Sequence, residues 1–273
     1  MNSNKCKIRK FLNKSAVNLE LIVRAEIGNY KMSQILTFLG ESSAARTKIA
    51  IASAKSLANQ GKRVLLASGA EPVLPVMLSA DLGPDPQEIG ANLQAVQFQS
   101  SVLLERNWEE VKKLEAQYLK TPILKDVYGQ ELSILPGMDG ALALNAIREY
   151  FESGKYDVIV YNGTGDLNTL RMLGMPESIS WYVRRFRQLF INSDLGKAIS
   201  DSPFIQPLIS TFLNVNPTAD NFSQPTNQAN NILDKGKKVL ANPQQFSAFL
   251  VTTPDTMEVV TSRYLWGSAQ QVG

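Results

Sequence analysis

Residues 34–68 constrain the fold of this chain more than any other stretch. The apolar residues Ile35, Leu36 and Phe38 predict a buried parallel strand, and the apolar spacing over 47–59 predicts a helix that ends at Gly61. The apolar residues 64–66 predict a second buried strand. A strand, a helix and a second strand in this order form a βαβ unit, so the chain is expected to fold around a mostly parallel sheet.

The loop at 40–46 opens the helix of this unit, where free N–H groups and the helix dipole favour an anion. Residues 40–47 read GESSAART. In the phosphate-loop pattern G-x-x-x-x-G-K-[ST], Gly40 and Thr47 match, but Ala45 replaces the second glycine and Arg46 replaces the lysine. An ordinary turn between a strand and a helix fits these residues equally well, so both interpretations stay open here.

Composition excludes several classes of chemistry. The 273 residues include one cysteine, Cys6, and no histidine. Disulfide frameworks, cysteine-based metal sites, Ser-His-Asp triads and most zinc enzymes are therefore excluded. Catalysis would have to come from carboxylates, backbone amides, Lys or Arg, and Ser or Thr.

The formal net charge of +3 is unevenly distributed. Residues 1–31 carry seven Lys or Arg and two Glu, a net charge of +5, which leaves −2 for the rest. We interpret 1–31 as a basic extension and a candidate for disorder, with a targeting peptide as the alternative. The near-neutral remainder predicts no nucleic-acid partner, and no apolar run is long enough to predict an integral membrane segment.

Further strands and helices follow along the chain. We predict strands at 93–98, 156–162 and 246–252, and helices at 108–119, 141–151, 232–240 and 254–266. Residues 162–166, NGTGD, form a second small-residue loop at the end of a predicted strand, where ligands of α/β proteins bind. Residues 181–213 are helical in pattern and unusually apolar, and 214–228 predict a polar loop.

Five blocks of sequence together resemble one family. They occur in the order GESSAARTK, NQGKRVLLAS, LPGMDGALAL, YDVIVYNGTGDLNTLRMLGMPESISWYVRRF and FSAFLVTTPDTMEVV. This order resembles the anion-transporting ATPases, which include the arsenite-pump ATPase and the ATPase that targets tail-anchored membrane proteins. The resemblance implies an α/β fold: a mostly parallel P-loop NTPase sheet flanked by helices, with an inserted apolar helical subdomain. The ATPase-like domain would span 32–273, and its helical subdomain about 177–240.

The resemblance also implies a site for ATP and Mg²⁺. The family loop GKGGVGKTT falls on residues 40–48, which makes Thr47 the metal ligand and implies these ATP-binding residues: Gly40, Ser42, Ser43, Ala44, Ala45, Arg46, Thr47 and Lys48. The family's signature lysine, which reaches the partner subunit's nucleotide, falls on Glu41. Glycine positions occupied by Ser42, Ser43 and Ala45 predict a reshaped loop, because a side chain at positive φ costs roughly 1 kcal/mol.

Two acidic positions of the family are neutral in this chain. The water-orienting aspartate falls on Ala70 and the aspartate of the second switch falls on Asn162. The neighbouring acids Glu71 and Asp166 are therefore the candidate catalytic residues. Because positioning and charge stabilisation account for most of phosphoryl transfer, slow or absent ATP hydrolysis is expected.

The resemblance further implies a homodimer whose apolar region 181–213 receives hydrophobic membrane-protein helices as clients. The alternative is a catalytically inactive pseudo-ATPase that acts as a dimeric scaffold. Within this family the chain most resembles the divergent cyanobacterial and plastid type, and this resemblance implies a cytoplasmic or stromal location and a chain truncated at its C-terminus. An anion-pump subunit would need thiol ligands, and a dinucleotide-dependent dehydrogenase would need G-x-G-x-x-G, so both are disfavoured.

Overall fold

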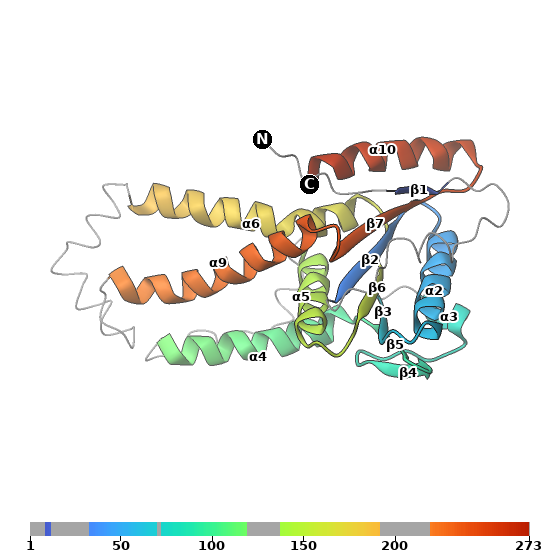
Figure 1. Ribbon diagram of the computed structural model, residues 1–273. Coiled ribbons are helices and arrows are strands. Elements are labelled where there is room, and N and C mark those ends of the chain that lie inside the picture. Colours follow the sequence, from blue (N-terminus) through green and yellow to red (C-terminus); the bar gives the residue numbers. More distant parts are fainter. Residues whose placement is uncertain (1–8, 12–32, 70–71, 119–136, 192–218, 273) are drawn as a thin grey trace. The chain divides into compact units, whose positions relative to one another are not determined.

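The computed structural model describes residues 9–11, 33–69, 72–118, 137–191 and 219–272 (Figure 1). Within these ranges seven strands form one sheet in the order β1-β7-β2-β6-β3-β5-β4. Their bounds are β1 Arg9–Phe11, β2 Gln34–Leu39, β3 Val64–Ser68, β4 Gln87–Gly90, β5 Leu93–Gln97, β6 Val158–Asn162 and β7 Phe246–Val251. All neighbouring strands are parallel except β4 and β5, which are antiparallel.

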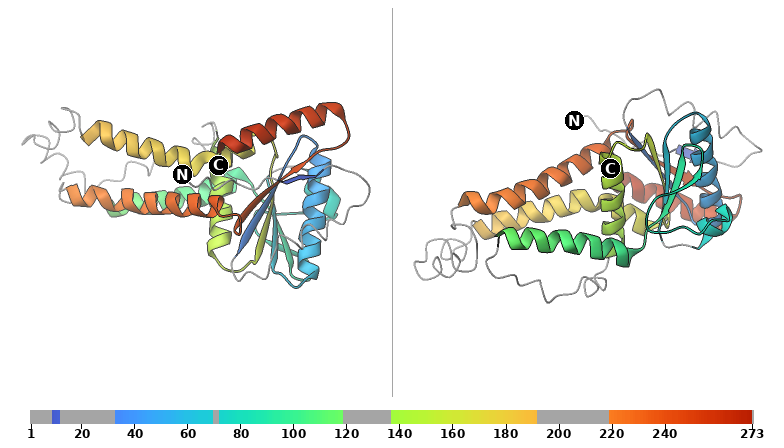
Figure 2. Two further views of the ribbon diagram at one scale, coloured as in Figure 1. Left: turned by 45° about the horizontal axis from the view of Figure 1, so that its top comes forward. Right: turned by 90° about the horizontal axis from the view of Figure 1, so that it is seen from below.

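The helices belong to two compact units of the chain, and α4, α6 and α9 each contribute residues to both. Their bounds are α2 Ser43–Asn59, α3 Val73–Leu78, α4 Ser100–Tyr118, α5 Met138–Glu152, α6 Leu167–Ile191, α9 Ala219–Ala241 and α10 Thr256–Val272. The sheet unit comprises residues 1–103, 136–174 and 238–273, and the other unit comprises 104–135 and 175–237. In the sheet unit, α2 and α5 lie on opposite faces of the sheet (Figure 2). The predicted α/β class with a mostly parallel sheet is confirmed.

The second unit is helical throughout its described residues. In this unit α6 and α9 lie side by side, because Lys237 of α9 donates a hydrogen bond to the Ser180 hydroxyl of α6 at 3.2 Å. The same ammonium group lies 3.7 Å from the carboxylate of Glu177 and 2.7 Å from that of Asp234. Among the helices that the structure describes, none is both long and apolar enough to span a membrane.

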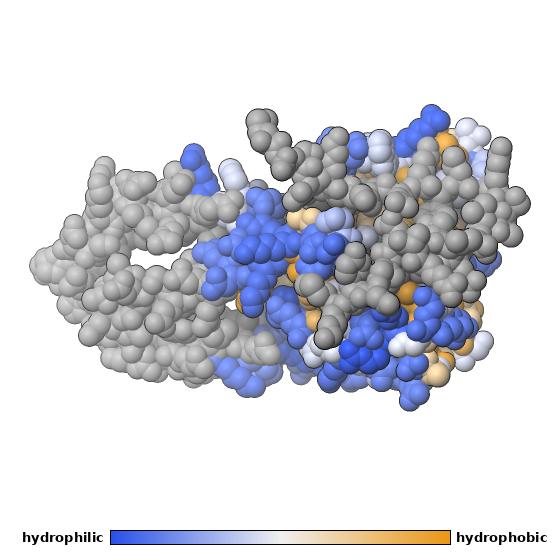
Figure 3. Space-filling model, viewed as in Figure 1, coloured by the Kyte–Doolittle hydropathy of each residue, from blue (hydrophilic) through white to orange (hydrophobic). Residues whose placement is uncertain are grey.

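The central strands are buried on both faces, which explains their continuous apolar runs. Every residue of β2, β3 and β6 is buried. Small residues of α2, Ala50 and Ala54, are fully buried against this sheet, and the Phe38 and Phe249 rings of β2 and β7 stack with centroids 5.6 Å apart. The described surface in Figure 3 is mostly hydrophilic, with hydrophobic residues in small groups. The core therefore lies where the sheet meets its helices.

Several predicted boundaries differ from the structure. Helix α2 begins at Ser43 rather than Thr47, because the Ser42 hydroxyl caps it by accepting the Ala45 N–H at 3.3 Å. The loop predicted for 214–228 is wrong over 219–228, which belong to α9, because polar side chains do not by themselves prevent helix formation. The short strands β1 and β4 and helix α3 were not predicted; β4 is largely exposed and lacks an apolar pattern.

Gly40 provides a test of the packing between β2 and β7. Its φ is +148°, and a Cβ there would overlap the Val251 carbonyl group of β7. We expect Gly40→Ala to lower the free energy of unfolding by about 3 kcal/mol, from backbone strain and overpacking together. The control is Gly61→Ala: its φ is +82° but a Cβ has no neighbour within 4 Å, so about 1 kcal/mol is expected. If urea unfolding showed that both variants lose the same free energy of unfolding, the close approach of Gly40 to β7 would be contradicted.

Candidate functional site

Two loops meet at the carboxyl edge of the sheet, because β2 and β6 are parallel neighbours. Residues 40–42 follow β2, and residues 163–166 follow β6. The Gly40 N–H donates to the Gly165 carbonyl oxygen at 2.8 Å, which joins the loops directly. The carboxyl edge of a parallel sheet is where ligands of α/β proteins bind, so this junction is the candidate site.

The first loop leads into the 17-residue helix α2. Ser42 has φ −73° and caps the helix, and the Arg46 N–H donates to the Ser42 carbonyl oxygen at 3.0 Å. In the described parts of the chain, only Ser79 and Asn92 have positive φ among residues other than glycine. Ser43 and Ala45 therefore lie in the helix without the backbone strain that their glycine positions suggested. The N-terminus of this helix favours an anion in front of it.

The side chain of Arg46 connects the two loops. Its Nη1 donates to the carbonyl oxygens of Gly40 at 2.6 Å and Glu41 at 3.4 Å, and its Nη2 donates to that of Gly163 at 3.2 Å. The residue is only 1% exposed. A Cβ at Gly165, whose φ is +69°, would overlap the Arg46 side chain, so glycine is required there. The loops thus hold a buried positive charge at the N-terminus of α2.

Next to Arg46, Thr47 and Asn162 form a buried pair. Nδ2 of Asn162 donates to the Thr47 hydroxyl oxygen at 3.0 Å, and Thr47 and Asn162 are 0% and 1% exposed. Oδ1 of Asn162 is buried and accepts no hydrogen bond in the described structure. The pair supplies neutral oxygens only.

These residues do not fit a tightly held Mg²⁺. Protein sites for this ion use one or two carboxylates together with substrate phosphates and waters. Thr47, the predicted metal ligand, has the amide of Asn162 beside it instead of a carboxylate. No group of three or more Cys, Asp or Glu side chains that could hold a metal occurs among the residues searched, which are the described ones.

Asp166 caps helix α6. One carboxylate oxygen accepts hydrogen bonds from the Thr164 hydroxyl at 2.6 Å, the Asn168 N–H at 2.9 Å and the Thr169 N–H at 3.3 Å. The other accepts from Nδ2 of Asn168 at 3.0 Å. Burial alone would raise the pKa of this carboxyl, but these hydrogen bonds lower it below its ordinary value. The carboxylate predicted to be catalytic is thus held by the start of α6.

The structure brings together most of the predicted ATP-binding residues. Six of them lie within the loop and the first turn of α2, namely Gly40, Ser42, Ser43, Ala44, Ala45 and Arg46, and Thr47 follows directly. Lys48 is exposed, and Glu71 lies outside the described residues.

Sequence reasoning missed Thr169, which holds the second loop in place. Its hydroxyl accepts the Gly165 N–H at 2.9 Å and lies 3.1 Å from the Thr164 hydroxyl. Thr169 is buried in the first turn of α6. The only signal in the sequence was a threonine three residues after the capping Asp166. This signal is weak, because polar residues are common in the first turn of any helix.

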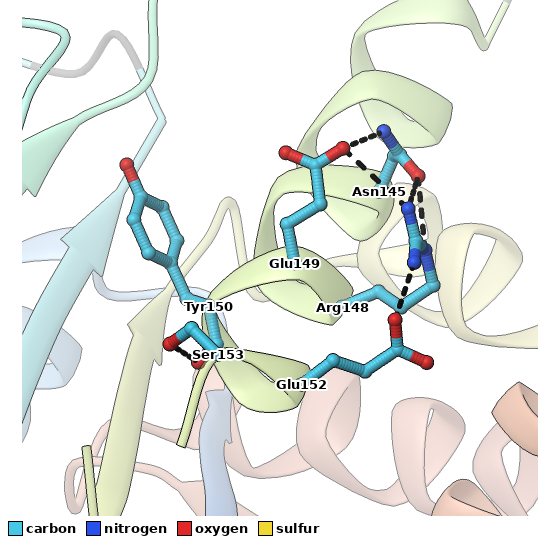
Figure 4. A network of polar contacts seen from close by, with 6 residues as sticks. All are labelled: Asn145, Arg148, Glu149, Tyr150, Glu152 and Ser153. Atoms are coloured by element: carbon cyan, nitrogen blue, oxygen red, sulfur yellow. Dashed lines mark hydrogen bonds and ion pairs between the residues drawn. The ribbon is translucent and has the colours of Figure 1, made fainter. Parts of the chain in front are cut away.

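A second polar network, on α5, is a surface feature of one helix (Figure 4). Arg148 donates to a carboxylate oxygen of Glu152 at 2.6 Å and to the side-chain oxygen of Asn145 at 2.8 and 3.1 Å. Nδ2 of Asn145 donates to Glu149 at 2.8 Å. Exposed pairs three or four residues apart add only a few tenths of a kcal/mol each, so we assign no binding role to this network.

The sheet order, the loop that opens α2 and the buried cationic side chain define a P-loop NTPase-like α/β domain. Residues 33–270 match the model of one family, described as anion-transporting ATPase. The chain therefore belongs to the anion-transporting ATPase family.

Individual relatives agree with this assignment. The chain is 31% identical over 171 residues to the "Putative arsenical pump-driving ATPase" of Chlorobaculum tepidum, covering 61% of this chain and 42% of the relative. It is 23% identical over 238 residues to a protein of the same name, numbered 1, from Aquifex aeolicus, covering 84% and 58%. Protein Rv2184c of Mycobacterium tuberculosis is 27% identical over 191 residues, covering 64% and 46%. The chain thus spans about half the length of these relatives.

The capping role of Asp166 predicts a pH-dependent stability. Because its pKa is lowered by folding, its stabilisation is complete above the ordinary aspartate pKa of about 4 and is lost as the pH falls through the lower folded value. We expect Asp166→Ala to lower the free energy of unfolding by about 1 kcal/mol at pH 7, and by less at pH 3.

Urea unfolding at both pH values measures this difference. The control is Asp166→Asn, which keeps an oxygen acceptor and does not titrate, so its unfolding free energy should vary less with pH than that of the wild type. A difference between Asp166→Ala and the wild type that stays the same at pH 7 and pH 3 would contradict the capping role.

Proposed function

We propose that this domain binds ATP at residues 40–48 and hydrolyses it slowly or not at all. The single observation that carries the proposal is the position of Arg46. Its guanidinium is buried between the two loops, at the N-terminus of the helix that an α/β nucleotide site uses for phosphate. The family to which the chain belongs supports a nucleotide as the anion.

The chemistry of this loop suits a polyphosphate. A guanidinium offers a planar fork of donors that pairs with two phosphate oxygens, whereas a lysine acts as a point charge. Arg46 now donates to three carbonyl oxygens, so a bound phosphate would exchange some of these neutral acceptors for charged ones. Hydrogen bonds to charged acceptors are stronger, which favours the exchange.

Slow or absent hydrolysis follows from the side chains at the second loop. Asn162 is neutral where a carboxylate is implied by the family, and Asp166 is held by the start of α6. The alternative, a catalytically inactive pseudo-ATPase that serves as a dimeric scaffold, shares these features, and it becomes the preferred proposal if turnover is absent rather than slow. We retain the homodimer as part of both proposals, and phosphate release measured with purified chain separates them.

Arg46→Ala tests the proposed nucleotide site. We expect the wild type to bind ATP with micromolar affinity in calorimetry, and Arg46→Ala to bind at least about tenfold more weakly because one charged donor pair is lost. Arg46→Lys should lie between them, since it keeps the charge but not the fork. The matched control is Lys55→Ala, an exposed charge on the same helix, which should bind like the wild type. If Arg46→Ala bound ATP with the affinity of the wild type, the proposal would be contradicted.

A second candidate function is the binding of apolar client helices by the helical unit. On α6, Ile179, Trp181 and Tyr182 are exposed, and Ile232 is exposed on α9. The Trp181 and Tyr182 rings contact edge to face with centroids 5.0 Å apart. Exposed aromatic residues of this kind are typical of binding surfaces. Most of the apolar region 181–213 that was expected to receive a client lies outside the described side chains, including Phe186 and Phe204.

The double variant Trp181→Ser, Tyr182→Ser tests client binding. We expect it to weaken binding of a fluorescent apolar peptide of about 20 residues, the length of a membrane-spanning helix, by roughly tenfold, because two aromatic contacts are lost. The control is Met257→Ser, Tyr264→Ser, which removes exposed apolar residues of α10 in the sheet unit. Equal binding by both double variants would contradict a client site on α6.

A further inference from the structure

We propose that ATP binding at this site does not require Mg²⁺. The proposal rests on the proposed function and concerns how the same loop neutralises the phosphates. It is carried by two observations: the pair formed by Thr47 and Asn162, and the buried guanidinium of Arg46.

Asn162 removes the attraction for a divalent cation at the hydroxyl predicted to bind it. The amide N–H of Asn162 donates to Thr47 Oγ1 at 3.0 Å, so a partial positive charge faces this oxygen. A carboxylate at the same position would place a negative charge there and would hold the waters of a Mg²⁺ ion. At a site with little exposure to water, the attraction for a cation depends strongly on whether this side chain is a neutral amide or a charged carboxylate.

No other described carboxylate of the two loops replaces the missing one. Glu41 is exposed, and the Asp166 oxygens accept hydrogen bonds from Thr164, Asn168 and Thr169. Asp166 therefore serves the start of α6, and Glu41 faces solvent at the edge of the loop. The donor set around Thr47 stays neutral.

Arg46 provides a permanent positive charge in the same loop. It is buried and is fixed by carbonyl oxygens on both loops, so it is already in place before a ligand arrives. Together with the N-terminus of α2, it attracts phosphate without a metal ion.

The free acceptor of Asn162 is consistent with this arrangement. Its Oδ1 is buried and accepts no hydrogen bond in the described structure. Asn162 lies beside Thr47, near the N-terminus of α2. An amide oxygen in this position accepts an O–H group from a water or a ligand. It does so without the full charge that would draw a divalent cation into the loop.

Calorimetry of ATP binding in EDTA and in millimolar Mg²⁺ tests the proposal with the full chain. For the wild type we expect the dissociation constants in EDTA and in Mg²⁺ to lie within about threefold of each other, because no carboxylate is present to bind the metal. For Asn162→Asp we expect Mg²⁺ to tighten binding by about tenfold or more, since the carboxylate restores the missing charge. Thermal melting of each variant without nucleotide establishes that it is folded.

Each outcome has a distinct meaning. Wild-type binding that needs Mg²⁺, or that Mg²⁺ tightens tenfold or more, overturns the proposal while leaving the proposed function intact. Equal affinities in EDTA and Mg²⁺ for a folded Asn162→Asp would show that Asn162 is not the cause, which also overturns it. No binding by the wild type in either buffer overturns the proposed function, and this inference with it. The wild-type ratio decides the matter even where the aspartate variant does not fold.

Discussion

The buried guanidinium of Arg46 is the interaction on which the rest of the site depends. A charge that is removed from water destabilises a protein unless hydrogen bonds compensate for it. Here the compensation comes from backbone carbonyl groups of two loops that are more than 100 residues apart in the sequence. These loops must therefore end neighbouring strands, and the residue at 165 must be glycine so that the side chain fits. Sheet order, loop shape and side-chain identity are linked through this one group.

The sheet supplies the rigid frame that this interaction requires. Strands β2 and β6 are buried on both faces and pair in parallel, which fixes their carboxyl ends side by side. On the other side of β2, Gly40 approaches the Val251 carbonyl group of β7 so closely that no side chain fits. The first loop is thus confined from both neighbouring strands. Such confinement keeps polar groups oriented before a ligand binds, which lowers the entropy lost on binding.

The central strands could be predicted from sequence because burial on both faces requires apolar residues. Exposed elements could not be predicted, because they need no apolar pattern. The runs at 35–38, 64–66 and 158–160 are apolar apart from Thr37, because the strands are covered on both faces, and this pattern predicts buried strands. Strand β4 pairs with β5 through backbone groups while its side chains stay largely exposed, which leaves no periodic signal. The loop pattern located Arg46 and Thr47, but their partners come from β6 and the loop after it. The capping role of Asp166 was predictable from sequence, since an aspartate before a helix commonly caps it, whereas the family resemblance implied a catalytic role for this residue.

The departures from the implied family pattern at positions 46 and 162 are compatible with one another. A lysine replaced by arginine keeps the positive charge and gives it a fixed geometry against the backbone of two loops. An aspartate replaced by asparagine removes a negative charge and turns a potential metal partner into a donor toward Thr47. Arg46 therefore keeps the attraction for anions, and Asn162 lowers the attraction for cations at the same edge of the sheet. Phosphoryl transfer needs charge stabilisation of the leaving and attacking oxygens as well as binding. We therefore propose that a site changed in this way still holds a phosphate but has lost much of the charge stabilisation needed to cleave it.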